Sequence, residues 1–186
     1  LHAFHFRNAK PLKQWLRVRP ANALTVLDTH DGIGIIDIGA DGDAAGLVPP
    51  SELDQLVESI HANSGGQSRL ATGAAASNLD LYQVNCTYYD ALGRDDRKYL
   101  LARALQFFVP GIPQVYYVGL LADTNDMALL ARSKVGRDIN RHHYSRAELL
   151  AALRQPVVER LCELIRLRNQ HPALDRKSTR LNSSHT

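Results

Sequence analysis

The sequence predicts a protein of the α/β class, and two observations lead to that prediction. First, the apolar run Leu24–Leu27 is typical of a buried strand, expected over residues 23–28, and polar residues that include His30 and Asp31 follow it. Parallel α/β proteins build their sites at such carboxyl ends of strands. Second, a predicted helix over residues 96–108 precedes a Pro/Gly turn and the strand-like run 114–118. Helix, tight turn and strand in this order form one α/β unit.

His30 and Asp31 are the first candidates for functional residues. They lie between the predicted strand and the glycines Gly32 and Gly34, which suit a sharp turn. A histidine beside an aspartate is a weak signal by itself. Its position at the end of a strand makes the signal stronger.

The composition is that of a globular domain, with 186 residues, 45% hydrophobic and 22% charged side chains. Residues 175–186 hold three of the 22 basic side chains and one of the 19 acidic ones, so the rest has a net charge of +1. No basic stripe remains that would predict nucleic-acid binding. No apolar run approaches the roughly 20 residues that cross a bilayer. We therefore expect neither a nucleic acid nor a membrane as a partner.

The two cysteines, Cys86 and Cys162, form neither a disulfide framework nor a Cys-x-x-Cys metal pattern. They fit a reducing compartment, so a cytoplasmic location is expected. The sequence carries no signal of an oligomeric state.

The first residues predict a strand end and a short helix. Leu1–Phe6 is short and aromatic, and its histidines, His2 and His5, would face opposite sides of a strand. Residues 10–18 predict a helix that begins near Pro11, because proline suits the first turn. The apolar face of that helix would consist of Leu12, Trp15 and Leu16.

Further helices are predicted from caps and apolar periodicity. Ser51 is the expected N-cap of one helix, a capping box begins at Ser145, and Pro156 opens a helix over residues 157–169. The inward residues expected for the helices that begin at residues 51, 96 and 157 are Leu53, Leu56, Val57 and Ile60, then Tyr99, Leu100, Ala104, Leu105 and Phe108, then Val158, Leu161, Leu164 and Ile165.

Three loops carry polar residues. The Gly/Asp-rich stretch 37–43 does not have the spacing of a calcium loop and predicts a turn-rich excursion. The stretch 71–85 fits either a packed surface loop or a binding loop. The long loop 122–144 contains the cluster Arg137–His142, which is a candidate clamp for an anion or a sugar, with a solvated charge run as the alternative.

Residues 175–186 do not continue the pattern of the chain. They have no periodicity and follow abruptly on a predicted helix. The stretch resembles the translation of a short-read sequencing adapter, and we expect it to be an artefact outside the fold.

Several blocks together resemble the sucrose phosphorylases and their close relatives, within the α-amylase-type glycoside hydrolase family. The blocks are Leu27–Gly34, Thr72–Asn85, Pro113–Gly119 and Gly136–Arg141, in the order and with the spacing of that family. The resemblance extends from about the start of the chain to Leu174.

The resemblance implies part of a TIM (β/α)₈ barrel, namely its last strands and helices. Residues 1–34 would be a barrel segment with the seventh strand (23–28), and residues 35–90 a small excursion domain with an acceptor loop. Residues 91–174 would hold the eighth strand (114–118) and the closing helices. A whole barrel needs about 250 residues, so the implied object is a fragment.

The family's reaction transfers glucose from sucrose to inorganic phosphate with retention, through a carboxylate nucleophile and a second, acid/base carboxyl group. A third acid stabilises the transition state by its charge, and Asp31 matches that acid. His30 matches the neighbouring ligand of the sugar hydroxyls. Arg137 matches the arginine that holds the glucose subsite and keeps the nucleophile ionised. The resemblance implies no cofactor and no metal ion.

Residues 79–83 match the family's acceptor loop. By this resemblance Asp80 would bind fructose hydroxyls, Leu81 and Tyr82 would line the fructose and phosphate side, and Gln83 would lie nearby.

The nucleophile and the acid/base lie on earlier strands in this family, and no Asp or Glu precedes Asp28 here. We therefore expect the chain alone to be inactive. We also expect it to be poorly stable, because an open barrel exposes strand edges.

Other functions stay open from the sequence. Within the same class, the substrate could be sucrose 6-phosphate or glucosylglycerate, or water could be the acceptor, as in a retaining glucoside hydrolase. A His–Asp metal phosphohydrolase would need more ligands at helical spacing, which His2, His5, His30 and His61 do not provide. A non-catalytic sugar-binding remnant is the alternative outside enzymes.

Overall fold

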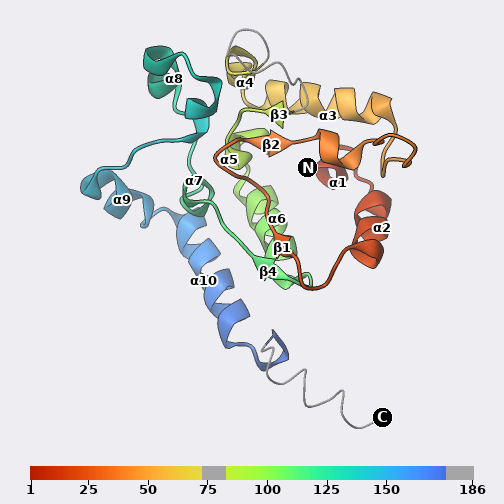
Figure 1. Ribbon diagram of the computed structural model, residues 1–186. Coiled ribbons are helices and arrows are strands. Elements are labelled where there is room, and N and C mark those ends of the chain that lie inside the picture. The colour runs from red at the N-terminus through yellow and green to blue at the C-terminus, as the bar shows by residue number, and fades with distance from the viewer. Residues whose placement is uncertain (73–82, 175–186) are drawn as a thin grey trace.

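The computed structural model describes residues 1–72 and 83–174, and this part of the chain is mixed α/β and mostly helical (Figure 1). The predicted artefact at residues 175–186 lies outside the described residues. The strands are β1 (Leu24–Thr25), β2 (Ile33–Gly34), β3 (Gln83–Val84) and β4 (Ile112–Pro113). The helices are α1 (His2–His5), α2 (Lys10–Val18), α3 (Pro50–Asn63), α4 (Gln67–Leu70), α5 (Tyr88–Ala91), α6 (Asp96–Phe108), α7 (Tyr117–Leu120), α8 (Met127–Ser133), α9 (Arg146–Ala152) and α10 (Pro156–Gln170), with 3₁₀ turns η1 (Ile36–Ile38), η3 (Gly136–Asn140) and η4 (Pro172–Leu174).

Strands β1 and β4 pair in parallel, with Leu24 opposite Ile112 and Thr25 opposite Pro113. A hydrogen bond from the Gln114 amide to the Thr25 carbonyl, 3.0 Å long, continues this pairing. A parallel pair needs a long crossover connection, and here the crossover contains α3 and α6. Strands β2 and β3 pair in an antiparallel manner, with Ile33 opposite Val84.

The prediction of a strand over residues 114–118 was wrong. The strand is Ile112–Pro113, and α7 already begins at Tyr117. The hydroxyl of Tyr116 donates to the Asn140 carbonyl and that of Tyr117 to the His142 carbonyl, each over 2.9 Å. These tertiary contacts hold the chain in a helical turn although the residues have high strand propensity.

The N-terminal prediction was wrong as well, because residues 2–5 form helix α1. The ring of His2 is buried and its Nε2 lies 2.6 Å from a carboxylate oxygen of Glu52 in α3. The expected N-cap Ser51 lies inside α3, which begins at Pro50 and has Pro49 at its N-cap position. Proline starts this helix because it lacks the N–H that would have no partner there.

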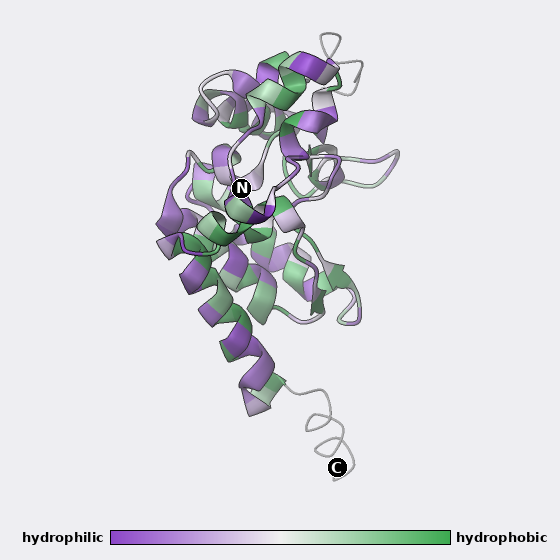
Figure 2. Ribbon diagram, turned by 90° about the vertical axis from the view of Figure 1, so that its left-hand side faces the viewer, coloured by the Kyte–Doolittle hydropathy of each residue, from purple (hydrophilic) through white to green (hydrophobic). Residues whose placement is uncertain are grey.

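The remaining helix predictions agree well with the structure. α2, α6 and α10 begin and end within one or two residues of their expected bounds, and α9 begins at the predicted capping box of Ser145 and Glu148. The apolar stripe of α3 is buried as expected. α10 packs against α6, and α3 packs against α5. Hydrophobic and hydrophilic residues lie side by side along these helices, as Figure 2 shows.

Helix α6 turns only part of the expected face inward, and Tyr99 is buried as predicted. Leu105 and Phe108 are exposed, whereas Arg103 and Gln106 are buried. The polar side chains face inward because Arg103 pairs with Asp28, three residues after β1. An ion pair between two residues that are 75 positions apart in the sequence therefore sets the rotation of this helix.

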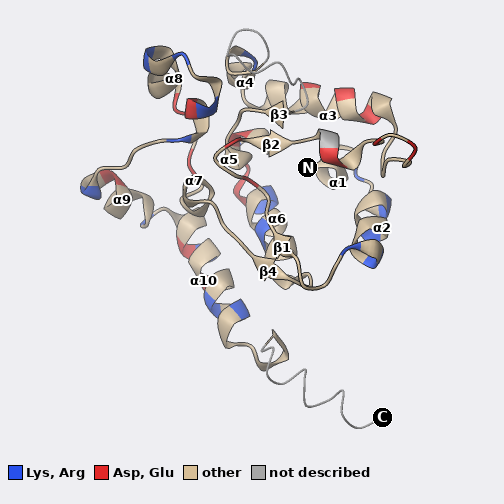
Figure 3. Ribbon diagram, in the orientation of Figure 1, with Lys and Arg blue, Asp and Glu red and all other residues tan. Residues whose placement is uncertain are grey.

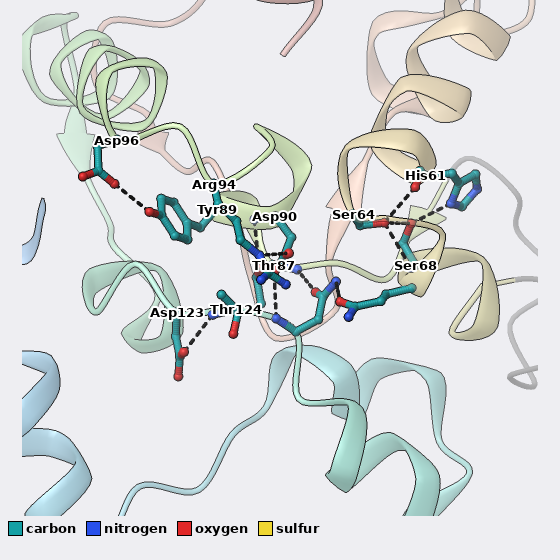
Figure 4. Close-up of polar contacts among 12 residues, drawn as sticks. His61, Ser64, Ser68, Thr87, Tyr89, Asp90, Arg94, Asp96, Asp123 and Thr124 are labelled. Atoms are coloured by element: carbon teal, nitrogen blue, oxygen red, sulfur yellow. Dashed lines mark hydrogen bonds and ion pairs between the residues drawn. The ribbon is translucent and has the colours of Figure 1, made fainter. Parts of the chain in front are cut away.

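A second buried polar network fixes α5 (Figure 4). The carboxylate of Asp90 accepts hydrogen bonds from the Thr87 hydroxyl (2.9 Å), the Asn125 amide (2.6 Å) and Nε of Arg94 (2.7 Å). Buried carboxylates need such partners because an unpaired charge in the interior is costly. The network joins α5 to the segment that leads into α8.

An apolar cavity of about 470 Å³ opens between α1, α2, β1 and α6. Its walls include Trp15 and Leu24, which are 38% and 58% exposed. The apolar face predicted for α2 therefore exists but has no buried residue. Figure 3 shows that α2 carries only basic charges and α3 only acidic ones. In the part of the chain that the structure describes, no helix has the length and apolar character that crossing a membrane requires.

Candidate functional site

The candidate site begins four residues after β1, in a tight turn from Thr29 to Gly32. The Gly32 amide donates to the Thr29 carbonyl (3.2 Å), and the Asp31 amide donates to the Thr29 hydroxyl (3.1 Å). Gly32 has a positive φ of 90°, and a Cβ there would lie 2.4 Å from the Val84 carbonyl oxygen. Only glycine fits this position, which lets β3 pack directly on the turn.

The carboxylate of Asp31 lies among three cationic or potentially cationic groups. Arg137 places a guanidinium nitrogen 3.1 Å from Oδ1, and Arg141 places one 3.4 Å from the same oxygen. Nε2 of His30 lies 3.3 Å from Oδ2. Both arginines come from the 3₁₀ turn η3 and its C-cap, more than 100 residues from Asp31.

The backbone of the turn is held as firmly as the carboxylate. Nδ2 of Asn140 donates to the Thr29 carbonyl over 2.8 Å, and Nε of Arg141 donates to the His30 carbonyl over 3.0 Å. The side chain of Gln83 donates to the Asp31 carbonyl over 2.8 Å. Two distant segments thus fix the direction in which Asp31 points.

A buried ion pair supports the strand that leads into the turn. One guanidinium nitrogen of Arg103 donates to both carboxylate oxygens of Asp28, at 2.9 Å each. Arg103 also donates to the Tyr99 hydroxyl, which donates in turn to the Gly119 carbonyl. A Cβ at Gly119 would lie 2.1 Å from both Arg103 and Asp28, so the pair requires glycine there. Burial raises the pKa of the Asp28 carboxyl, and the charge of Arg103 opposes that shift.

The Asp31 cluster differs from this support in being open to solvent. The side chains of His30, Asp31 and Arg137 are 63%, 36% and 50% exposed. Exposed ion pairs contribute only about 0–1 kcal/mol each to stability. Stability therefore gives little reason for cationic groups to converge on one accessible carboxylate, whereas binding a polar ligand gives a good one.

The structure brings together His30, Asp31, Arg137 and Gln83 from the residues that the sequence singled out. Asp80, Leu81 and Tyr82 lie outside the described residues. The cluster Arg137–His142 divides into two parts, because its arginines contact Asp31 whereas His142 contacts Asp126 at 2.6 Å.

Sequence reasoning assigned no role to Asn140, Asp28 or Arg103. A signal for Arg103 was present, since a lone arginine between two alanines breaks the apolar face of α6. Asn140 and Arg141 lie in the block Gly136–Arg141, yet nothing local indicates that they contact the Thr29–Gly32 turn.

No group of three or more His, Cys, Asp or Glu side chains is arranged to hold a metal ion within residues 1–72 and 83–174. No family model matches the chain.

Known proteins similar to this chain are phosphorylases, so the class that the chain resembles is that of the sugar phosphorylases. The resemblance to the sucrose phosphorylases is confirmed in particular. The sucrose phosphorylase of Agrobacterium vitis is 64% identical over 176 residues, which are 94% of this chain and 36% of the relative. That of Bifidobacterium adolescentis is 58% identical over 94% of this chain and 35% of its own length.

Among solved structures, the crystal structure of sucrose 6F-phosphate phosphorylase from Thermoanaerobacter thermosaccharolyticum is similar, with a TM-score of 0.78 and 40% identity. The match covers 93% of this chain and 34% of that one. This chain therefore spans about a third of the length of the relatives it matches.

Proposed function

We propose that this chain is a fragment of a retaining glucosyl phosphorylase that converts sucrose and phosphate to glucose 1-phosphate and fructose. The observation that carries the proposal is the Asp31 carboxylate, which Arg137 and Arg141 hold at the carboxyl end of β1 in a chain 64% identical to a sucrose phosphorylase. In this reading Asp31 is the acid that stabilises the oxocarbenium-like transition state. His30 binds sugar hydroxyls and Arg137 binds at the glucose subsite.

The arrangement of strands supports a partial barrel. β1 and β4 are parallel neighbours, as the seventh and eighth strands of a barrel would be. Asp31 follows β1 at the carboxyl end, which is the end where barrel enzymes carry their sites. We propose the domain bounds on the same basis, with barrel segments at residues 1–34 and 91–174 and the excursion at 35–90.

The electrostatics of the cluster support a role in the transition state. An oxocarbenium-like transition state carries positive charge, which a fixed carboxylate stabilises more than it stabilises the neutral substrate. The hydrogen bonds to the Thr29–Gly32 turn fix Asp31 before substrate binds, so little reorganisation is needed during the reaction.

Gln83 supports an acceptor loop beside the cluster, because its side chain donates to the Asp31 carbonyl. We propose that Asp80 binds the fructose hydroxyls and that Leu81 and Tyr82 line the side where fructose leaves and phosphate enters.

A chimera tests the proposal. Residues 1–174 replace the matching segment of the Agrobacterium vitis sucrose phosphorylase, and glucose 1-phosphate is measured with sucrose and phosphate. We expect the chimera to be active. Asp31→Asn should lower its rate by about 100- to 1000-fold, the usual loss for one transition-state stabiliser. Asp43→Asn, at an exposed position away from the cluster, is the control. A folded chimera without activity would favour a non-catalytic sugar-binding remnant.

The isolated 186-residue chain is the second sample. We propose that it is inactive, because retention needs a nucleophile and an acid/base that no Asp or Glu before Asp28 provides. Release of glucose 1-phosphate by the purified chain would contradict this.

Assays with several glucosyl donors identify the substrate. Relatives named for glucosylglycerol and sucrose 6(F)-phosphate are 46% and 44% identical to this chain. Assays of the chimera with sucrose, sucrose 6-phosphate, glucosylglycerol and glucosylglycerate, each with and without phosphate, separate these substrates. Phosphate-independent release of glucose would indicate a hydrolase instead.

A further inference from the structure

The side chain of Arg141 contacts both the backbone and the carboxylate of the Thr29–Gly32 turn. Its Nε donates to the His30 carbonyl over 3.0 Å, and another nitrogen lies 3.4 Å from Oδ1 of Asp31. Its remaining terminal nitrogen lies 3.5 Å from Oδ1 of Asp138. One guanidinium therefore joins the backbone and the carboxylate of the turn to a second carboxylate on η3.

Asn140, the residue before Arg141, also contacts the turn. It is almost fully buried, and its amide donates to the Thr29 carbonyl over 2.8 Å. The Asn140 carbonyl accepts from the Tyr116 hydroxyl at 2.9 Å, which anchors the end of η3 to the residue before α7. The backbone next to Arg141 is therefore held in place by the hydrogen bonds of Asn140.

Arg137 and Arg141 differ in geometry although both contact Oδ1 of Asp31. Among the described residues Arg137 contacts the Asp31 carboxylate through one guanidinium nitrogen, and its side chain is 50% exposed, so it is accessible to a ligand. Arg141 is 30% exposed and has protein acceptors on each of its guanidinium nitrogens. The planar fork of arginine suits such divided contacts, whereas the single ammonium of lysine does not.

We propose that Arg141 is the positioning residue of Asp31: it sets the direction of the carboxylate for the transition state and does not itself bind substrate. This inference rests on the proposed function and adds a residue to it. A change in the orientation of the Asp31 carboxylate weakens its interaction with the transition state, but it changes the affinity for the substrate little. The expected signature is therefore a fall in kcat with a much smaller change in KM.

The kinetic test uses the chimera described above. Arg141→Ala should lower kcat by roughly 10- to 100-fold, the effect of a displacement of about 1 Å at a reacting centre. Arg141→Lys should stay impaired, because it keeps the charge but loses the fork. Added guanidinium ion should restore part of the kcat of Arg141→Ala and none in Asp31→Asn. Arg137→Ala should instead raise KM, and Arg146→Ala, at an exposed position on α9, is the neutral control.

A measurement without catalysis separates this inference from the proposed function. Hydrogen exchange of the Asp31 and Gly32 amides, measured by mass spectrometry in the 186-residue chain, should be faster in Arg141→Ala than in native chain or Arg146→Ala. Faster exchange with an inactive native chimera would overturn the proposed function, while the finding that Arg141 holds the turn would stand. Unchanged exchange, or an active chimera whose kcat is insensitive to Arg141, would overturn the positioning role alone.

Discussion

Arg103 donates to both carboxylate oxygens of Asp28 over 2.9 Å, and neither side chain exposes more than 1% of its surface. The pair joins the middle of α6 to the last residue before the Thr29–Gly32 turn. Arg103 also donates to the Tyr99 hydroxyl and to the side-chain carbonyl of Gln106. The buried guanidinium therefore has polar partners besides Asp28. The site is therefore built on a fully desolvated ion pair.

Removing one member of this pair should destabilise the chain severely. Arg103→Met leaves the Asp28 carboxylate buried without its cation, a change that typically costs about 3–5 kcal/mol. The free energy of unfolding, measured with urea, checks this. Glu58→Gln removes the exposed Glu58–Arg69 ion pair on the surface and should cost less than about 1 kcal/mol. Equal effects of the two substitutions would contradict the argument.

Gly32→Ala should damage both the turn and the activity of the chimera. The new Cβ would lie 2.4 Å from the Val84 carbonyl oxygen at a residue with φ of 90°. Backbone must move to relieve that contact, since no flexible side chain is involved. Gly42→Ala is the matched control, because Gly42 also has a positive φ but nothing lies within 4 Å. The control should lose only about 1–2 kcal/mol of stability; a similar loss in both would refute the steric explanation.

His61 should make the stability of the chain depend on pH. Its ring is buried, Nδ1 lies 2.6 Å from the Ser68 hydroxyl, and burial lowers its pKa from the usual 6.5. As the pH falls below about 6.5, the unfolded chain binds this proton before the folded chain does, so stability falls. In His61→Gln this part of the pH dependence should disappear from urea unfolding curves between pH 7 and 5. His5→Gln, at an exposed ring, should leave it unchanged.

The outer edge of β1 should promote association of the isolated chain. β1 pairs only with β4 among the described residues, and Leu24 is 58% exposed. A free strand edge with exposed apolar side chains is a template for pairing with another chain. Sedimentation should reveal concentration-dependent association that Leu24→Lys reduces. Leu150→Lys removes a comparably exposed leucine from helix α9, and an equal effect would show that apolar exposure alone is responsible.

The helices could be predicted because their signals are local. α3 and α10 begin at prolines and repeat apolar residues at helical spacing, so caps and periodicity fixed them within a few residues. The short strands could not be predicted with the same success. Tyr116 and Tyr117 favour a strand by propensity, but their hydroxyls bind carbonyls beyond α8, which no local pattern reveals.

In the candidate site, too, residues with a local sequence signal could be predicted, and residues placed by tertiary packing could not. Asp31 could be found because it lies in the polar stretch that follows an apolar run, and Arg137 because it lies in a recognisable block. The roles of Asn140 and Arg141 depend on the distance at which η3 lies from the turn, and that distance is set by packing. Arg103 turned inward against the apolar pattern of α6 because Asp28 offered it a buried partner.

The hydrogen bond from Arg141 to His30 spans 111 residues of sequence. A ribosome adds about 5–20 residues per second, so roughly ten seconds separate the synthesis of the two residues. During that interval the turn that carries Asp31 lacks the contacts that η3 and Arg141 make with it. The carboxylate therefore acquires its final direction only near the end of translation of this stretch, and a nascent chain that stops before η3 would carry the residue without its orientation.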